Sequence, residues 1–428
     1  MTLQSWVASA NRPGTDFPIH NLPYGVYESP SGLRIGVAIG DSILDLRACS
    51  ERGFMGDEIA HACAAESLNQ LMALGETHCL KLRRRLTELL AAGSPQQHAL
   101  EPALVPRTDA PMRVPVVIGD YTDFFASLFH ATNAGGMFRP ENPLFENYKY
   151  LPVGYHGRAS SVVVSGSPVW RPQGQMESKA GGAPRFGPSR ALDYEMEVGM
   201  FVGPGNQRGE AVSIERAGSH IFGMCLLNDW SARDIQGWES APLGPFLSKS
   251  FGTTISPWVV PMEALEPFRV PAFARAEGDP APLPHLFSNR DQASGGIDLT
   301  VEVHLTTAKM RAAGAQPHML SRGNARDLYW TVAQMLTHHT SNGCNLRPGD
   351  LLGSGTISGP ASDSWGCLLE ITRRGQEPIR LPNGEERRFL EDDDEIVLRG
   401  YCERAGAVRI GFGECRGRVA LARAGNDT

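Results

Sequence analysis

Short β-type segments separated by glycine- and proline-containing turns dominate residues 116–428, and this texture restricts the fold more than any other feature. The runs include SSVVVSG, YEMEVGMFV, IDLTVEVHL, CLLEITR, DEIVLRGYC and VRIGFGEC. Helical stretches interrupt them near 120–131, 229–239 and 325–342. Many short strands with a few segregated helices predict an α+β fold that is mainly β.

The first 50 residues have the same texture and predict a small domain of their own. YGVYES, LRIGVAIG and SILDLR are strand-like runs that are typical of a small SH3-like β-barrel. Leucines recur near helical spacing over 58–93, so helix is expected after the strands. The proline-rich stretch that follows places a domain boundary near residue 115. We therefore predict an N-terminal domain of residues 1–115 and a C-terminal domain of residues 116–428.

Composition and charge exclude several classes of partner. The net charge of −7 argues against nucleic acid, which requires a basic face. No apolar run approaches the roughly 18 residues of a membrane helix, and the first residues lack a signal-peptide pattern. The eight cysteines form no C-x-x-C pair, which is typical of free thiols in a reducing cytosol. We therefore expect a cytoplasmic protein without a nucleic-acid or membrane partner.

ALDYEMEVGMFVG, residues 191–203, places carboxylates in a row on one face of an expected strand. Alternation along the strand puts Asp193, Glu195 and Glu197 on the face opposite the apolar side chains. Like charges repel, and a buried carboxylate without a partner is strongly unfavourable. Two interpretations are open: a water-exposed edge strand, or a divalent cation such as Ca²⁺ or Mg²⁺ between Glu195 and Glu197.

Two expected helices place further ionisable side chains together. Asp123 and His130 are seven residues apart, nearly two helical turns, and therefore share a face. They could be a metal ligand and a general base, or a helix-start aspartate and an ordinary polar histidine. Asp229, Arg233 and Gln236 follow with spacings of four and three. Asp229 could also be a plain N-cap.

Lys249 and Glu370 are later candidates with weaker local signals. Lys249 follows GPFLS, which is not a phosphate loop because Ser248 stands where glycine is required and Pro245 lacks an amide donor. Glu370 lies on the expected strand CLLEITR, where it could orient a histidine or be a solvated side chain. The sequence has no G-x-S-x-G elbow and no H-E-x-x-H motif. A serine hydrolase therefore has little support.

Taken together, these stretches resemble the fumarylacetoacetate hydrolase family. The likeness is carried by IGDYTDF, HATN, LPVGYHGRASSVVVSG, NDWSARDIQ, PLGPFL, KSFGTT and SGTISGP, and it spans essentially the whole chain. It implies a hydrolase that cleaves the carbon–carbon bond of 4-fumarylacetoacetate to fumarate and acetoacetate, the last step of tyrosine and phenylalanine breakdown. It also implies a dicarboxylate diketone as the small-molecule substrate, a metal-binding catalytic C-terminal domain, and a homodimer.

The resemblance assigns the acidic residues to a metal site. Glu195 and Glu197 bind a divalent cation, Ca²⁺ or Mg²⁺, and Asp123 and Asp229 complete the set. A second ion position, of the kind that holds magnesium, involves Asp229, Lys249 and Thr253. A protonated lysine cannot be a ligand through its ammonium group, so Lys249 would act there through its charge or its backbone.

The remaining roles implied by the resemblance concern catalysis and substrate. His130 deprotonates water, and Glu370 orients the imidazole. The residues that stabilise the oxyanion are Arg233, Gln236 and Lys249. The residues that match positions holding the polar ends of the substrate are Arg139, Tyr155, Gln236 and Thr356. Phe125 and Ser240 occupy substrate-contacting positions where the family commonly has tyrosine, which leaves fine substrate specificity open.

Two other functions are compatible with these residues. A decarboxylase, isomerase or acylpyruvate hydrolase of the same superfamily would keep the acidic site, although His130 with Glu370 favours hydrolysis. A non-catalytic metal-binding protein would have no use for a base, its orienting carboxylate and an oxyanion trio. An assay on fumarylacetoacetate with and without a chelator separates the three.

Overall fold

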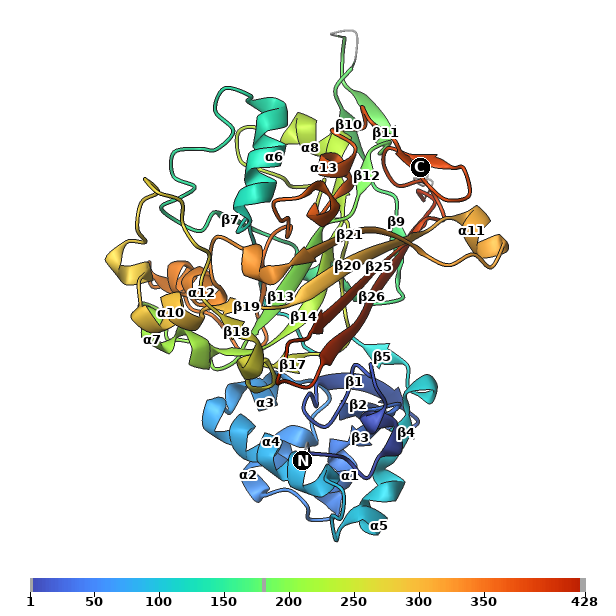
Figure 1. Cartoon of the computed structure of the whole chain (residues 1–428), viewed down its shortest axis with the longest axis vertical. Helices are drawn as coiled ribbons and strands as arrows, with labels where there is room; N and C mark the ends of the chain where they lie inside the picture. Colours follow the sequence, from blue (N-terminus) through green and yellow to red (C-terminus); the bar gives the residue numbers. More distant parts are fainter. Residues whose placement is uncertain (1–2, 179–181, 424–428) are drawn as a thin grey trace, which may run out of the picture.

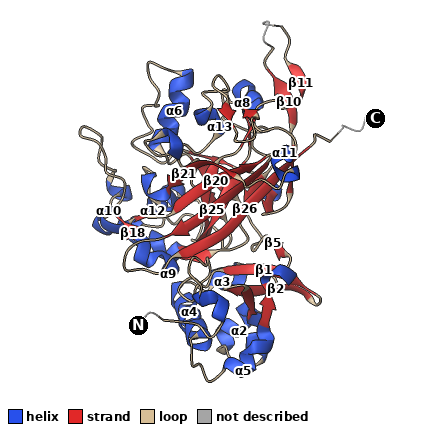
Figure 2. Cartoon of the chain, turned by 45° about the vertical axis from the view of Figure 1, so that its right-hand side comes forward, coloured by secondary structure: helices blue, strands red, loops and turns tan. Residues whose placement is uncertain are grey.

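The computed structural model describes residues 3–178 and 182–423. The N-terminal elements, blue in Figure 1, form a region at one end of the molecule. In the larger region, strands occupy the centre and helices lie around their ends and edges (Figure 2). The predicted α+β fold, mainly β in its C-terminal part and with a small N-terminal β domain, is confirmed.

The N-terminal region combines an antiparallel sheet with helices. Leu82, Leu86 and Leu89 of its longest helix recur every three or four residues and are buried, which fixes the packed face of that helix. Gly75, with φ of +77°, precedes it and separates it from the helix before, and the single helix expected over 58–93 is in fact three helices. The strands, in spatial order, are β4 (Leu104–Pro106), β3 (Ser42–Asp45), β2 (Gly32–Ile39), β1 (Tyr24–Ser29) and β5 (Met112–Arg113). The helices are α1 (Leu46–Glu51), α2 (Asp57–Cys63), α3 (Asn69–Ala73), α4 (Glu76–Leu90) and α5 (Gln97–Leu100).

The predicted boundary near residue 115 lies in the segment that follows β5. Contacts nevertheless cross it. The backbone N–H of Tyr24 donates to the carbonyl of Val259 at 2.9 Å, and Asn21 donates to the carbonyl of Gly411 at 2.7 Å. One apolar cluster also contains side chains from both regions. The boundary therefore remains a prediction about folding units.

A central sheet carries most of the candidate residues. Its strands, in spatial order, are β7 (Gly154–His156), β6 (Tyr121–Phe124), β22 (Leu351–Gly353), β13 (Met196–Val202), β14 (Ile221–Asp229), β16 (Thr253–Ile255) and β8 (Val162–Val164), and β17 (Val260–Pro261) pairs with β14. β13 and β14 are antiparallel, whereas β6 runs parallel to β22. Pairing sets Asp123 beside Gly353 and Asp229 beside Thr253. Acidic residues far apart in sequence thus come from neighbouring strands.

A second sheet packs against the central one. Gly400 lies so close to Leu226 of β14 that a methyl group on it would lie 2.5 Å from a leucine carbon, and Val301, Val303 and Leu398 enter the same core cluster. Its strands, in spatial order, are β21 (His318–Asn324), β20 (Thr300–Thr306), β25 (Glu395–Cys402), β26 (Ile410–Ala420) and β9 (Pro168–Trp170). Smaller pairs are β10 (Gln173–Met176) with β11 (Arg185–Pro188), β12 (Leu192–Asp193) with β15 (Ser231–Ala232), β18 (Arg269–Val270) with β19 (Gly296–Ile297), and β23 (Ile379–Arg380) with β24 (Glu386–Arg387).

Three helices, α6, α8 and α13, gather near one end of the sheets, at the top of Figure 1. Their bounds are α6 (Leu128–Phe138), α8 (Arg233–Glu239) and α13 (Leu368–Ile371). The other helices of this region are α7 (Ile214–Ala217), α9 (Met262–Leu265), α10 (Asn289–Ser294), α11 (Ala308–Ala312) and α12 (Val332–Thr340). Among the residues described, none of the helices combines the length and apolar character needed to cross a bilayer.

Candidate active site

The acidic residues Asp123, Glu195, Glu197 and Asp229 converge. One carboxylate oxygen from each lies within 4.8 Å of the others, and all four side chains are buried. They come from β6, from the two-residue link between β12 and β13, from β13, and from the last residue of β14. Four carboxylates in a dry site repel strongly unless protons or cations neutralise them.

The structure corrects the expected acidic strand. The run 191–203 is split at Tyr194 and Glu195 into β12 and β13, and its side chains are buried on both faces. The water-exposed edge strand is therefore wrong. Asp193 is not one of the converging carboxylates, and its carboxylate instead accepts hydrogen bonds from Arg233 and from backbone amides.

The electrostatics of the cluster differ from one carboxylate to the next. Burial, followed by the charge of neighbouring carboxylates, raises the pKa of Asp123 and of Glu197 well above the ordinary range. Burial also acts on Glu195, but the charges of Lys249 and Arg233 outweigh it and lower its pKa. Burial raises the pKa of Asp229, opposed by Lys249. Glu195 is thus held as an anion, while additional positive charge would stabilise the ionised forms of the other three carboxylates.

The oxygens present fit a hard divalent cation. Glu197 Oε1 is buried and has no hydrogen-bond partner among the described residues. The Gly355 N–H contacts Asp123 Oδ1 at 3.2 Å and Glu197 Oε2 at 3.1 Å, which holds the two carboxylates together. Gly353 leaves open the space between them, since a Cβ there would collide with Asp123 Oδ1 and lie 3.2 Å from Glu197 Oε2. Carboxylate oxygens are the ligands that Ca²⁺ and Mg²⁺ take.

Lys249, Thr253 and Tyr155 surround Asp229. The Lys249 ammonium donates to Glu195 and lies 3.1 Å from Asp229 Oδ2. Thr253 Oγ1 donates to Asp229 Oδ1 at 2.7 Å, and the Tyr155 hydroxyl donates to Asp229 Oδ2 at 2.7 Å. Neighbouring carboxylates raise the pKa of Lys249 despite its burial. Lys249 is therefore a charged neighbour of the cluster.

His130 and Glu370 form a buried pair. His130 Nδ1 lies 2.7 Å from Glu370 Oε2, and each side chain is almost fully inaccessible. Ser127 caps α6 by accepting a hydrogen bond from the backbone of His130, which places the imidazole in the first turn. Burial would raise the pKa of Glu370, but the His130 charge and the hydrogen bonds from His130 and Asn133 outweigh it and lower the pKa.

The local structure around three candidates differs from expectation. Asp123 lies on β6 and not on a helix with His130, because YTDF pairs with β22 and β7. Asp229 ends β14 and is neither helical nor an N-cap, since that strand continues by pairing with β16. Glu370 lies on the single turn α13 and not on a strand. The residues still meet, but tertiary pairing rather than a shared helix brings them together.

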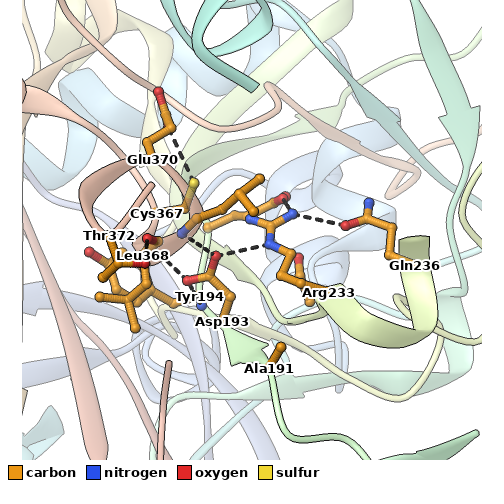
Figure 3. A network of polar contacts seen from close by, with 12 residues as sticks. Ala191, Asp193, Tyr194, Arg233, Gln236, Cys367, Leu368, Glu370 and Thr372 are labelled. Carbon is orange, nitrogen blue, oxygen red and sulfur yellow. Dashed lines mark hydrogen bonds and ion pairs between the residues drawn. The ribbon is translucent and has the colours of Figure 1, made fainter. Parts of the chain in front are cut away.

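Arg233 and Gln236 lie one turn apart on α8. Arg233 Nη1 donates to Glu195 Oε1 at 2.8 Å and to Gln236 Oε1 at 3.1 Å, and Nε donates to Asp193 Oδ2 at 2.9 Å (Figure 3). Nη2 is buried without a partner among the described residues. A guanidinium has five N–H donors in a fixed plane, so two of them remain for a ligand.

The side chains expected to contact the substrate differ in whether their polar groups already have hydrogen-bond partners. The Thr356 hydroxyl is buried with no partner within the described ranges. Arg139 is exposed, stacks on the Phe145 ring at 4.0 Å and donates to the carbonyl of Pro143. Ser240 Oγ donates to the backbone carbonyl of Gln236 at 2.6 Å. Its hydroxyl is therefore engaged at the C-terminal end of α8.

Phe125 lies against the histidine. Its ring centroid is 5.2 Å from that of His130, with an edge-on interplanar angle of 79°. The Tyr148 ring also lies edge-on to Phe125, with centroids 6.0 Å apart, and its hydroxyl donates to the Phe125 carbonyl. Phe125 thus takes part in an aromatic wall beside His130.

Several polar groups at the site were missed by the sequence reasoning. Glu370 accepts further hydrogen bonds from Asn133 Nδ2 and Ser358 Oγ, both at 2.8 Å, and from Cys367 Sγ at 3.2 Å. The i, i+3 spacing of His130 and Asn133 in HATN was the available signal for Asn133. Ser358 and Cys367 had none, because only the fold brings their segments to the carboxylate.

The fold and this site define an α+β enzyme with a buried carboxylate cluster beside a histidine–glutamate pair. The family model described as fumarylacetoacetate (FAA) hydrolase C-terminal matches residues 121–420, and the one described as fumarylacetoacetase N-terminal matches residues 20–115. The chain therefore belongs to the fumarylacetoacetate hydrolase family, and it is a hydrolase.

Similar proteins agree with this placement. The chain is 49% identical over 415 residues to the fumarylacetoacetases of Bos taurus and Homo sapiens, covering 95% of this chain and 96% of each relative. It is 48% identical over 414 residues to that of Arabidopsis thaliana, covering 94% of this chain and 95% of the relative. The solved fumarylacetoacetate hydrolase from psychrophilic Exiguobacterium antarcticum has a TM-score of 0.52 at 18% identity, covering 94% of this chain and all of that one. This last likeness concerns the fold.

Proposed function

We propose that this hydrolase cleaves the carbon–carbon bond of 4-fumarylacetoacetate to fumarate and acetoacetate, the last step of tyrosine and phenylalanine breakdown. The observation that carries the proposal is the buried contact of 2.7 Å between His130 and Glu370 beside a cluster of four carboxylates. Relatives of about half identity over nearly the whole chain are named for this activity.

His130 is the proposed general base. With Nδ1–H directed at Glu370, the free Nε2 accepts a proton from the attacking water. Glu370 remains ionised and stabilises the imidazolium that forms, which agrees with its lowered pKa. The water oxygen bonds to the carbonyl carbon on the fumaryl side, the bond between that carbon and the acetoacetate carbon breaks, and the departing carbon takes up the proton held by His130.

Arg233, Gln236 and Lys249 are the proposed oxyanion residues. The free Nη2 donors of Arg233 supply the donor type that stabilises charge developing in a dry site. Lys249 adds a second positive charge next to Glu195 and Asp229. Negative charge on the tetrahedral oxygen and on the leaving group is therefore met by fixed donors.

The proposed cation is Ca²⁺ or Mg²⁺. The residues that would hold it are Asp123, Glu195, Glu197 and Asp229, and Thr253 together with Lys249 would adjust the charge and orientation of Asp229. When bound, such an ion supplies Lewis-acid stabilisation of negative charge on diketone oxygens. The charge of Lys249 lowers the pKa of Asp123 and of Glu197 but does not outweigh burial and the neighbouring carboxylates, so without a metal these two groups would take up protons.

Substrate orientation is assigned to Arg139, Tyr155, Gln236 and Thr356. The Thr356 hydroxyl, which has no partner among the described residues, is suited to a polar end of a dicarboxylate, whereas the Tyr155 hydroxyl has to leave Asp229 before it can donate to one. Arg139 has to leave Phe145 to reach a ligand carboxylate. Phe125 supplies shape rather than a hydroxyl, and Ser240 acts through Gln236.

A cytosolic homodimer completes the proposal. All eight cysteines lie in the described part of the chain and are free, which suits a reducing compartment. Leu243, Phe246 and Leu247, in the loop after α8, are exposed and apolar, as expected for residues covered by a second copy. Light scattering on the purified protein tests the dimer, and a monomer at micromolar concentration would contradict it.

The test of function is a product assay. Purified protein is mixed with fumarylacetoacetate, and fumarate and acetoacetate are quantified with and without a chelator. We expect equimolar products, loss of activity on chelation, and recovery on adding Ca²⁺ or Mg²⁺. Release of CO₂ or an isomerised diketone would indicate a related superfamily reaction. Binding without turnover would indicate a metal-binding protein.

A further inference from the structure

Asp193 is the one acid of the D-x-E-x-E run, 193–197, that lies outside the carboxylate cluster. Its side chain is completely buried, and both of its oxygens are occupied. Oδ1 accepts from the N–H groups of Leu368 at 2.8 Å and Tyr194 at 2.9 Å, and Oδ2 accepts from Leu369 N–H and Arg233 Nε, both at 2.9 Å. One carboxylate therefore contacts two elements that are far apart in sequence (Figure 3).

The first of these elements is α13, which carries Glu370. The amides of Leu368 and Leu369 are the first two of this single turn, and no side-chain cap from Cys367 satisfies them. Asp193 thus supplies the acceptors that a turn of this length cannot supply for itself. By holding these two amides, Asp193 fixes the backbone of α13. It therefore also fixes the direction in which the Glu370 carboxylate points toward His130.

The second element is the guanidinium of Arg233. Asp193 takes the Nε–H, while Glu195 and Gln236 take Nη1. This leaves Nη2 as the nitrogen without a partner among the described residues. Because a guanidinium is planar and rigid, fixing Nε and Nη1 also fixes the direction of both Nη2 donors.

We propose that Asp193 is a positioning residue that sets the free Nη2 of Arg233 and the carboxylate of Glu370 in one fixed relation. This inference rests on the proposed function, in which Arg233 stabilises the oxyanion and Glu370 orients the base. Asp193 touches neither substrate nor cation. It holds the general base and the oxyanion donor, which lie on separate segments, in the relative positions they need to act on the same substrate carbonyl.

Asp193→Asn tests the charge and the acceptors together. Asparagine keeps the shape of the aspartate side chain. Its NH₂ group at the Oδ2 position, however, is a donor that faces two other donors, the Arg233 Nε–H and the Leu369 N–H. We expect kcat to fall about 10- to 100-fold, as for a misplacement near 1 Å. KM and the Kd for Ca²⁺ should stay within about threefold, because Glu195 still holds Arg233. The matched control is Asp394→Asn, a buried aspartate paired with Arg387 at 2.8 Å outside the site. It should lose stability but keep kcat.

A second pair of variants applies if Asp193→Asn does not fold. Leu368→Pro removes the backbone N–H that donates a hydrogen bond to Asp193 Oδ1. Proline is tolerated at the first position of a helix, and Cys367 already has the extended φ of −154° and ψ of 160° that suit a residue before proline. Leu368→Ala removes the same buried side chain but keeps the N–H. We expect kcat of Leu368→Pro to lie about 5- to 20-fold below that of Leu368→Ala.

The outcomes separate this inference from the proposed function. Wild-type protein without hydrolase activity would overturn the proposed function whatever Asp193 does. Active wild-type protein with an Asp193→Asn kcat within threefold of it would overturn the inference, as would an equal loss in Asp394→Asn. Equal kcat for the proline and alanine variants at Leu368 would also overturn it.

Discussion

Replacing Gly353 with alanine should weaken cation binding selectively. The new Cβ would collide with Asp123 Oδ1 and lie 3.2 Å from Glu197 Oε2, and real Cβ atoms essentially never come within 3.0 Å of a neighbour. Since Gly353 and Asp123 are paired across β22 and β6, the carboxylate rather than the backbone has to move. The collision therefore displaces a proposed ligand without removing any charge.

The size of the effect follows from the ligand geometry. Ca–O bonds span only about 2.3–2.6 Å, so a shift of several tenths of an ångström takes an oxygen out of the coordination shell. Disturbing the groups that orient a metal ligand typically weakens affinity about 10- to 100-fold. Overpacking should also lower the free energy of unfolding by about 1–3 kcal/mol. The lower entropy of the unfolded alanine chain offsets about 0.4–1 kcal/mol of that loss.

The assay is calorimetric titration of chelator-treated protein with CaCl₂ and MgCl₂, together with urea unfolding. Gly36→Ala is the control, because a Cβ there collides with Ile43 in the N-terminal sheet, away from the acidic residues. It should lose comparable stability and keep its affinity for Ca²⁺. Folded Gly353→Ala protein that binds Ca²⁺ with the wild-type Kd would refute the idea that Asp123 and Glu197 share one ion.

Three further predictions concern single side chains. Glu197→Ala should reduce metal occupancy in equilibrium dialysis, and unchanged occupancy would count against its role as a ligand. Phe125→Tyr should keep kcat within about threefold or lower KM; a collapse of turnover would show that the pocket depends on the phenyl ring beside His130. Glu370 has a lowered folded-state pKa, so its ionised form stabilises the fold above the ordinary carboxyl pKa of about 4.3, and this contribution is lost as pH falls through the lowered value. The unfolding free energies of wild type and Glu370→Gln should therefore differ most near neutral pH and converge in acid, and a pH-independent difference would contradict the assignment.

The fold class was accessible from sequence because its signals are local. Short runs bounded by glycine and proline became strands in both regions, and the leucine spacing of 58–93 became helix. Local patterns failed where pairing decides the conformation. YTDF was expected to be helical, yet it forms β6 because β22 and β7 bind its backbone.

The candidate site shows the same limit. The spacing of Glu195 and Glu197 pointed to a cation, but Asp123 and Asp229 joined them only through the family resemblance, since they lie on other strands. CLLEITR was expected to be a strand, but Asp193, 175 residues before Leu368, accepts hydrogen bonds from the amides of Leu368 and Leu369 and stabilises a helical turn. Rules that use only neighbouring residues cannot predict a contact between residues so far apart in the sequence.

In the proposed mechanism, His130, oriented by Glu370, is the base of a metal-dependent carbon–carbon hydrolase. The most direct measurement is kcat on fumarylacetoacetate, together with the Kd for Ca²⁺, for wild type and His130→Ala. We expect the kcat of His130→Ala to be about 10²- to 10⁴-fold lower than that of the wild type, the usual share of general base catalysis. The Kd should not change, because the imidazole is not among the proposed ligands. A His130→Ala enzyme with near-wild-type turnover would show that His130 is not the base and that another group activates the water.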